Sequence, residues 1–319
     1  MASILREVSK TVFGSGTAPP KRVIFVGTRG SSKTTTLGLI ALTCDILSTQ
    51  EPGFTHFIDE RTSGICQVPS DLCQGMFPEP TPPSLIYEAD LFLSWKTTLT
   101  EKTLMLPFCE TAGEDIQNLI GPYQKSVYKQ SVDYQQADNL NRYICDSNGY
   151  VLVVPVSRAH IEGVPQMDEE PQALLQDPDV NLHRILSAIY RYKMKSRSPK
   201  IEGIAVVLTK YDMVDAYLKN KGMDLYNPQG AKAFLDTYFR QTMGSLKHYG
   251  IEKVKFFPMH VQVERVKNEA TGRIEFAKWP EDSGRHGYKI ATDTDRNLPR
   301  YSEQSCRQLI YWLKDIFAR

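Results

Sequence analysis

The chain has 319 residues, of which 41% are hydrophobic and 24% are charged, a composition that excludes an intrinsically disordered protein. Its formal net charge of +1 gives no reason to expect nucleic acid or an anionic membrane as a partner. No run of residues approaches the roughly 20 apolar ones that a membrane-spanning helix needs, so no transmembrane segment is expected.

The cysteines and the chain ends favour a cytoplasmic protein. The six cysteines include no close pair with zinc-site spacing, and a chain of this size needs no disulfides, so we interpret them as reduced thiols. The first ten residues lack the apolar run of a signal peptide. We also expect no lipid anchor, because the sequence begins Met-Ala and ends without a prenylation motif.

Residues 1–20 are expected to form an N-terminal helix and a linker. Ile4, Leu5, Val8 and Val12 recur at helical spacing, and residues 14–20 are rich in Gly, Ser and Pro. We favour a helix that packs on its own domain over one that docks on a membrane or a partner.

From residue 21 onward, short apolar runs alternate with helical patterns. Buried strands are predicted at 21–26, 150–156 and 204–208, a further strand at 254–258, and a hairpin at 89–99 and 102–110. Helices are predicted at 37–47, 116–144, 180–195, 231–248 and 302–317. Residues 51–84 are expected to be irregular and 160–179 to be a loop. This order predicts one α/β domain over residues 21–319, with a mostly parallel sheet and one antiparallel edge strand.

The first motif, Gly27-Thr28-Arg29-Gly30-Ser31-Ser32-Lys33-Thr34, lies between the first strand and the first helix. It matches the P-loop pattern G-x-x-x-x-G-K-[ST], except that Ser32 replaces the second glycine. In such loops backbone N–H groups and a helix N-terminus hold phosphates, and the hydroxyl after the lysine binds Mg²⁺. An ordinary Gly/Ser turn is the alternative. The predicted nucleotide contacts are Gly27, Arg29, Gly30, Ser31, Ser32, Lys33, Thr34 and Thr35, with Thr34 also on the metal.

The second motif, Glu110-Thr111-Ala112-Gly113-Glu114-Asp115, follows the second hairpin strand. It resembles the D-x-x-G switch of Ras-like P-loop GTPases, with Glu110 where aspartate is usual. The resemblance implies that Glu110 contacts Mg²⁺ through water and that the N–H of Gly113 senses the γ-phosphate. Without the preceding P-loop and hairpin, the segment would be a capped turn before a helix.

The third motif, Thr209-Lys210-Tyr211-Asp212, follows a predicted buried strand and resembles the N-K-x-D guanine motif, with threonine in first place. An aspartate carboxylate accepts two hydrogen bonds from guanine that adenine cannot donate. The Lys210 stem is expected to cover one face of the base. A surface turn after a strand is the alternative interpretation.

Two weaker predictions complete the site. A switch threonine that binds Mg²⁺ is expected before the first hairpin strand, where Thr81 is preferred over Thr62 and Ser84. A second base-contacting loop is expected after residue 258. His260 lies there, but the usual Ser-Ala-Lys is absent, and a packed or surface histidine is the alternative.

The resemblance implies a guanine-nucleotide switch that hydrolyses GTP to GDP. Glu114 stands where Ras-like proteins have a water-positioning glutamine, and a carboxylate there repels the γ-phosphate, so turnover is expected to be slow. Arg29 is a catalytic candidate on the interpretation that it supplies a cation in cis, as an arginine finger does. The alternative interpretations are that it crowds the site or that it points to solvent. The alternatives are a non-catalytic, GTP-dependent interaction module and an ATPase or kinase.

The predicted fold is the three-layer P-loop NTPase fold, as a Ras-like G domain with insertions near 49–84, 117–144, 160–179 and 262–300. These insertions make the chain similar to the enlarged Ras-like GTPases of prokaryotes. The implied ligands are GTP or GDP and Mg²⁺, and the implied partner is a protein effector or regulator that contacts the switch segments.

Overall fold

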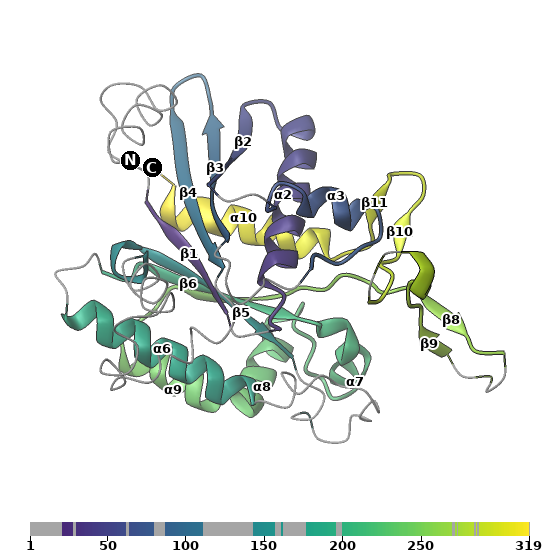
Figure 1. Ribbon diagram of the computed structural model, residues 1–319. Coiled ribbons are helices and arrows are strands. Elements are labelled where there is room, and N and C mark those ends of the chain that lie inside the picture. Colours follow the sequence, from purple (N-terminus) through teal and green to yellow (C-terminus); the bar gives the residue numbers. More distant parts are fainter. Residues whose placement is uncertain are drawn as a thin grey trace, which may run out of the picture.

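The computed structural model describes most of the chain from residue 21 onward (Figure 1). The described residues are 21–27, 30–61, 64–79, 87–110, 143–156, 161, 177–195, 200–269, 272, 274–283, 285 and 287–318. The N-terminal helix and linker expected at residues 1–20 lie outside this part.

A four-stranded parallel sheet with the order β1-β5-β6-β7 forms the centre of the fold. Its strands are β1 (Val23–Gly27), β5 (Gly149–Pro155), β6 (Gly203–Thr209) and β7 (Val254–Pro258). Every residue of β1, β5 and β6 is buried, because helices cover both faces of the sheet. The strands predicted at 21–26, 150–156, 204–208 and 254–258 are confirmed, and so is the α/β fold class, although only Phe257 and Pro258 of β7 are buried.

Three further strands have the order β2-β3-β4 and pair antiparallel with one another. They are β2 (Phe54–Glu60), β3 (Tyr87–Lys96) and β4 (Glu101–Glu110). The β3–β4 hairpin confirms the predicted one, with its turn closed by Thr97 N–H on the Thr100 carbonyl at 2.8 Å. A parallel bridge between Arg22 and Met105 joins β4 to the start of β1. Across the resulting order β2-β3-β4-β1-β5-β6-β7, β3 is antiparallel to the other described strands.

The prediction that residues 51–84 are irregular was wrong for two parts of this segment, β2 and the helix α3 (Val68–Cys73). Strand β2 pairs with β3 along its whole length, and composition alone does not reveal such a partner. Helix α3 packs on Gly38, where a side chain would lie 2.6 Å from Val68 and 2.8 Å from Leu72. The remaining segments of 51–84 have no regular structure where described.

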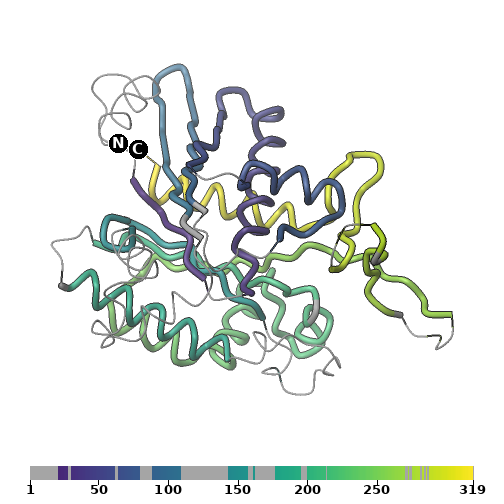
Figure 2. Tube along the Cα trace, in the orientation of Figure 1, coloured from purple at the N-terminus to yellow at the C-terminus, as the bar shows by residue number. Residues whose placement is uncertain are grey.

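Helices cover the two faces of the sheet and give three layers (Figure 2). On one face lie α2 (Lys33–Gln50) and α10 (Glu303–Phe317), and on the other α6 (Pro178–Lys195), α8 (Pro228–Tyr238) and α9 (Arg240–His248). Strand β1 alternates between them, because Val23 and Phe25 pack toward α2 and α10 while Ile24 and Val26 pack toward α6. The helices predicted at 37–47, 180–195 and 302–317 are confirmed.

The single helix predicted at 231–248 is instead two helices, α8 and α9, which meet at Phe239. Phe239 has φ −128° and ψ 38°, and its buried ring packs against Phe234 at 5.5 Å. The Asp179 carboxylate then accepts hydrogen bonds from the N–H groups of Gln241 and Thr242 at 2.9 and 2.8 Å, which caps α9. Of the helix predicted at 116–144, only its last two residues are described, and they begin a helical turn over 143–146.

Smaller elements lie in the connections. After β6 come the 3₁₀ turn η3 (Tyr211–Met213) and the short helix α7 (Asp215–Asn220). The segment predicted as the last insertion contains β8 (Arg265–Lys267), β9 (Ile274–Phe276), η4 (Glu281–Ser283), β10 (Thr292–Asp293) and β11 (Leu298–Pro299). In Figure 1 the β8–β9 ribbon projects away from the layered body. Within the described residues, the structure contains no helix long and apolar enough to cross a bilayer.

Candidate functional site

The P-loop and the third motif meet at one edge of the sheet. Gly27 ends β1 opposite Val153, and Thr209 ends β6 opposite Pro155, so both motifs follow the carboxyl ends of parallel strands. Arg22 and Met105 form a parallel bridge, Gly27 lies five residues after Arg22, and Glu110 lies five residues after Met105. The end of β4 at Glu110 therefore reaches the same edge of the sheet as Gly27. Ligands of open α/β sheets bind outside this edge, which therefore holds the candidate site.

The backbone conformation at Ser32 explains why the consensus has glycine at this position. Gly30 has φ 70° and Ser32 has φ 64°, both in the left-handed region. Ser32 is the N-cap of α2, and its carbonyl accepts the first helical hydrogen bond, from the Thr36 N–H at 2.8 Å. A side chain in this conformation costs about 1–2 kcal/mol. Ser32 thus occupies a glycine position at a conformational cost.

We expect Ser32→Gly to stabilise the fold slightly. Removing the left-handed strain gains about 1–2 kcal/mol, while glycine loses about 0.5–1 kcal/mol of chain entropy, so a net gain of up to about 1.5 kcal/mol is expected. Urea unfolding measures this difference. Ser70→Gly, in α3 and with no positive φ, is the matched control and should destabilise. Equal destabilisation by both changes would contradict the strain argument.

Lys33 lies buried at the start of α2, with only 6% of its surface exposed. Its Nζ donates to the Gly27 carbonyl at 3.0 Å, so the side chain folds back over the loop. A Cβ on Gly27 would lie 2.6 Å from both Ser31 Oγ and the Val153 carbonyl oxygen, which leaves no room for a side chain there. The loop is therefore closely packed around a buried cation.

Two features of the loop fit an anionic ligand. No acidic residue lies in the first turn of α2, and Ser32 makes no side-chain cap bond, so no carboxylate of that turn neutralises the positive helix end. Ser31 Oγ is buried and has no hydrogen-bond partner within the described residues. A buried hydroxyl without a hydrogen-bond partner costs free energy unless a ligand or a water molecule supplies the partner.

The hydroxyl of Thr209 connects the third motif to the P-loop. Thr209 Oγ1 donates to the Ser31 carbonyl at 3.0 Å and lies 3.4 Å from the Val154 carbonyl. Threonine in the first place of the motif thus contacts the candidate phosphate loop directly. This contact joins residues that are 178 positions apart in the chain.

The rest of the third motif is fixed by a buried tyrosine. Lys210 has φ 59° and turns the chain into η3. Tyr211 is completely buried, and its Oη accepts a hydrogen bond from the Leu225 N–H at 3.2 Å. Asp212, between these anchored positions, remains half-buried. The turn therefore holds Asp212 in a defined place at the sheet edge.

Thr209→Val is expected to weaken nucleotide binding by about 5- to 50-fold. Valine keeps the shape but removes the hydroxyl, and a buried carbonyl left without its partner costs about 1–3 kcal/mol. The measurement is the affinity for a fluorescent GDP. Thr237→Val on α8 removes a hydroxyl that donates to the Ala233 carbonyl of its own helix, and it should leave the affinity unchanged. Unchanged affinity in Thr209→Val would show that the contact does not support the site.

His260 lies two residues past β7 and is held by Ser302. The His260 N–H donates to Ser302 Oγ at 3.0 Å, and the Ser302 N–H donates to the His260 carbonyl at 3.1 Å. The Nδ1 of His260 is buried and has no hydrogen-bond partner in the described part of the chain. The contact of Ser302 with His260 was not predicted, although serine before an acidic residue at a helix start is an N-cap signal.

Several predicted site residues lie outside the described part of the chain: Arg29, Thr62, Thr81, Ser84, Gly113 and Glu114. The side chain of Glu110 also lies outside it, although its backbone ends β4 opposite Tyr87. Their roles therefore stay predictions. In the described residues, no group of three or more His, Cys, Asp or Glu side chains has an arrangement that would hold a metal ion.

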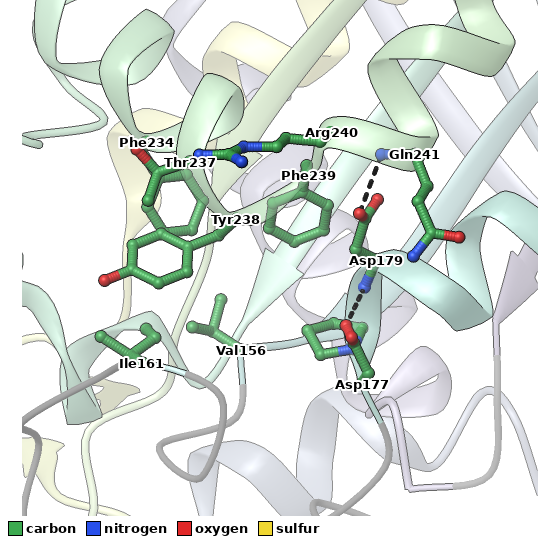
Figure 3. A pocket seen from close by; sticks show the side chains of 11 residues that line it. Val156, Ile161, Asp177, Asp179, Phe234, Thr237, Tyr238, Phe239, Arg240 and Gln241 are labelled. Atoms are coloured by element: carbon green, nitrogen blue, oxygen red, sulfur yellow. Dashed lines mark hydrogen bonds between the residues drawn. The ribbon is translucent and has the colours of Figure 1, made fainter.

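A cavity of about 360 Å³ lies away from this site, where α6, α8 and α9 meet at the end of β5 (Figure 3). Its wall includes the Phe234 and Phe239 rings and Val156. The carboxylate of Asp179 in this wall is already occupied by the two N–H groups of α9. None of the described residues predicted to bind nucleotide lines this cavity, but the Val156 N–H donates to the Thr209 carbonyl at 2.9 Å.

No protein-family model matches the chain, and no curated protein matches it. Among solved structures, the GTP-bound GTPase-like domain of S. cerevisiae Ski7 is similar, with 12% identity and a TM-score of 0.38. That match covers 75% of this chain but only 42% of the Ski7 chain. The signal recognition particle receptor SRb-GTP/SRX complex from Chaetomium thermophilum gives 11% identity, a TM-score of 0.33 and coverage of 76% and 92%. Similarity at this level does not bear on the function of the chain.

Proposed function

We propose that this chain binds GTP and GDP with Mg²⁺ at the P-loop, and that it works as a nucleotide-dependent switch that hydrolyses GTP slowly. The observation that carries the proposal is the hydrogen bond from Thr209 Oγ1 to the Ser31 carbonyl at 3.0 Å. It connects the candidate phosphate loop to the candidate base motif. Two independent sequence motifs that meet in space support a nucleotide site better than either motif alone.

The phosphates would be held by the P-loop and the start of α2. The N–H groups at the start of α2 precede the first helical hydrogen bond, and Lys33 supplies the cation. Thr34 would bind Mg²⁺ with its hydroxyl, and Glu110 and Thr81 are the proposed further contacts. When bound, Mg²⁺ neutralises charge on the β- and γ-phosphates.

Guanine would be selected by Asp212. Its carboxylate accepts hydrogen bonds from the ring N–H and the exocyclic amino group of guanine, and adenine lacks this pair of donors. Lys210 would cover one face of the base. The unpartnered Nδ1 of His260 makes this histidine a candidate for a further base contact.

Turnover is expected to depend on Glu114 and Arg29. Two negative charges about 4 Å apart repel by roughly 1–4 kcal/mol, and about 1.4 kcal/mol is a tenfold change in rate. We therefore expect slow single-turnover hydrolysis in the wild type. Glu114→Gln should raise the rate if repulsion dominates and lower it if the carboxylate is a base, and Arg29→Ala should lower it if the arginine acts in cis. A fast rate of GTP hydrolysis that neither substitution alters would show that neither residue has the role proposed for it.

The second candidate function is a non-catalytic module that binds GTP and presents its switch segments to a protein effector. Three departures from the family pattern favour it: Ser32, Glu110 and Glu114. Single-turnover hydrolysis with excess protein separates the two. Release of phosphate at a rate above that of free GTP supports the enzyme, whereas tight binding without release supports the module.

A further inference from the structure

The β8–β9 ribbon separates its charges between two faces. Arg265 lies opposite Phe276, and Val266 lies opposite Glu275. Because directly opposed residues of an antiparallel pair share a face, and successive residues alternate, both cations of β8 lie on the side of Phe276. One face therefore carries Arg265 and Lys267, whereas Glu275 lies on the other.

Two aromatic rings extend the first face. Phe276 and Tyr288 pack edge to face at 5.7 Å, and each ring carries a cation, Arg265 at 5.9 Å and Lys278 at 5.7 Å. A β-bridge between Lys278 and Tyr288 continues the pairing. The three cations are exposed, and the two rings are half-buried. We call Arg265, Lys267, Phe276, Lys278 and Tyr288 the cationic–aromatic face.

We propose that the cationic–aromatic face binds single-stranded nucleic acid. Lysine and arginine side chains contact phosphates, and half-exposed rings provide surfaces on which bases stack. Alternate residues of a strand are about 6.4–6.8 Å apart, so Arg265 and Lys267 are spaced to contact successive phosphates of an extended strand. A sheet face with exposed rings fits unstacked bases, whereas a duplex keeps its bases covered.

The opposite face of the ribbon carries acidic residues, so the net charge of the whole chain does not reveal the cationic–aromatic face. Glu264 and Glu275 lie on that face, and Glu275 Oε1 accepts a hydrogen bond from Asn268 at 2.9 Å. The net charge of +1 is a sum over all 319 residues of the chain, so it does not describe either face of the ribbon. A polyanion that approaches the cationic–aromatic face meets the cations first.

The test is fluorescence anisotropy of labelled oligouridylate and oligodeoxythymidylate with the full chain. The wild type should bind at least one of them, and affinity should fall with salt, by a logarithmic slope of about 0.7 for each phosphate contacted. Arg265→Glu with Lys267→Glu should weaken binding about tenfold or more and lower this slope. The milder pair Arg265→Gln with Lys267→Gln should weaken it in the same direction, because these exposed side chains are replaced without reversing charge.

The ribbon supplies its own control. Glu264→Gln with Glu275→Gln changes the opposite face and should not weaken binding. Tyr288→Leu keeps an apolar side chain but removes the ring, and it should weaken binding about fivefold or more. Binding that the folded charge variants leave unchanged would overturn the proposal. Competition by polyglutamate as effective as that by oligouridylate would also overturn it, because the face would then select only negative charge.

Discussion

Lys33→Ala is expected to abolish measurable nucleotide binding, with a loss of about 100-fold or more in affinity. The ammonium group is buried and lies against the Gly27 carbonyl, where electrostatic interactions are screened less than in water. Hydrogen bonds to charged groups contribute about 1.5–3 kcal/mol each, and lysine has three donors. Loss of the side chain therefore removes the main positive charge proposed to face the phosphates. Titration with a fluorescent GDP measures the effect.

The control for this variant is Lys232→Ala, on the exposed surface of α8. Lys232 forms an exposed ion pair with Asp236, so its removal should change neither affinity nor stability appreciably. Lys33→Met keeps the apolar stem in its buried position and separates the loss of charge from a loss of packing. A folded Lys33→Ala protein that retains its affinity for GDP would refute the P-loop assignment.

Asp212→Asn is expected to weaken GTP binding by roughly 10- to 100-fold and to remove the preference for guanine. The amide keeps one acceptor oxygen but presents an NH₂ donor in place of the other, so one of the two guanine donors is left without a partner, at a cost of about 1–3 kcal/mol. Xanthine carries a carbonyl in place of the guanine amino group, so the amide of asparagine can donate to it. Xanthosine triphosphate should therefore bind the variant better than GTP does.

The control for base selection is Asp215→Asn, three residues further along the chain, at the start of α7. Asp215 pairs with Lys219 on α7, and this pair should not influence base selection. Competition between GTP, ATP and xanthosine triphosphate measures the preference of each variant. An unchanged preference for GTP in Asp212→Asn would exclude Asp212 as the residue that selects the base.

The parts of the fold that the sequence predicted are those with local signals. The strands β1, β5 and β6 are buried on both faces and therefore appear as continuous apolar runs. The P-loop is a contiguous motif between a strand and a helix, and its geometry is set by left-handed residues such as Gly30. Elements of this kind can be identified without knowing what lies beside them.

The parts that the sequence did not predict depend on contacts between distant residues. Strand β2 acquires its structure from pairing with β3, and the break at Phe239 depends on a cap from α6. The ion pair of Arg61 with the buried carboxylate of Asp90 also forms only after folding, and burial still raises the pKa of Asp90. In the site itself, Ser302 reaches His260 across 42 positions of sequence. No local pattern indicates these partners.

The most direct test of the central claim is competition between GTP and ATP for the wild-type protein. The protein is loaded with fluorescent GDP in the presence of Mg²⁺, and each unlabelled nucleotide is added in increasing amounts. We expect GTP to displace the label at concentrations about 100-fold or more below those that ATP requires, because adenine cannot satisfy Asp212. Displacement by ATP as effective as that by GTP would contradict the assignment of a guanine-nucleotide site.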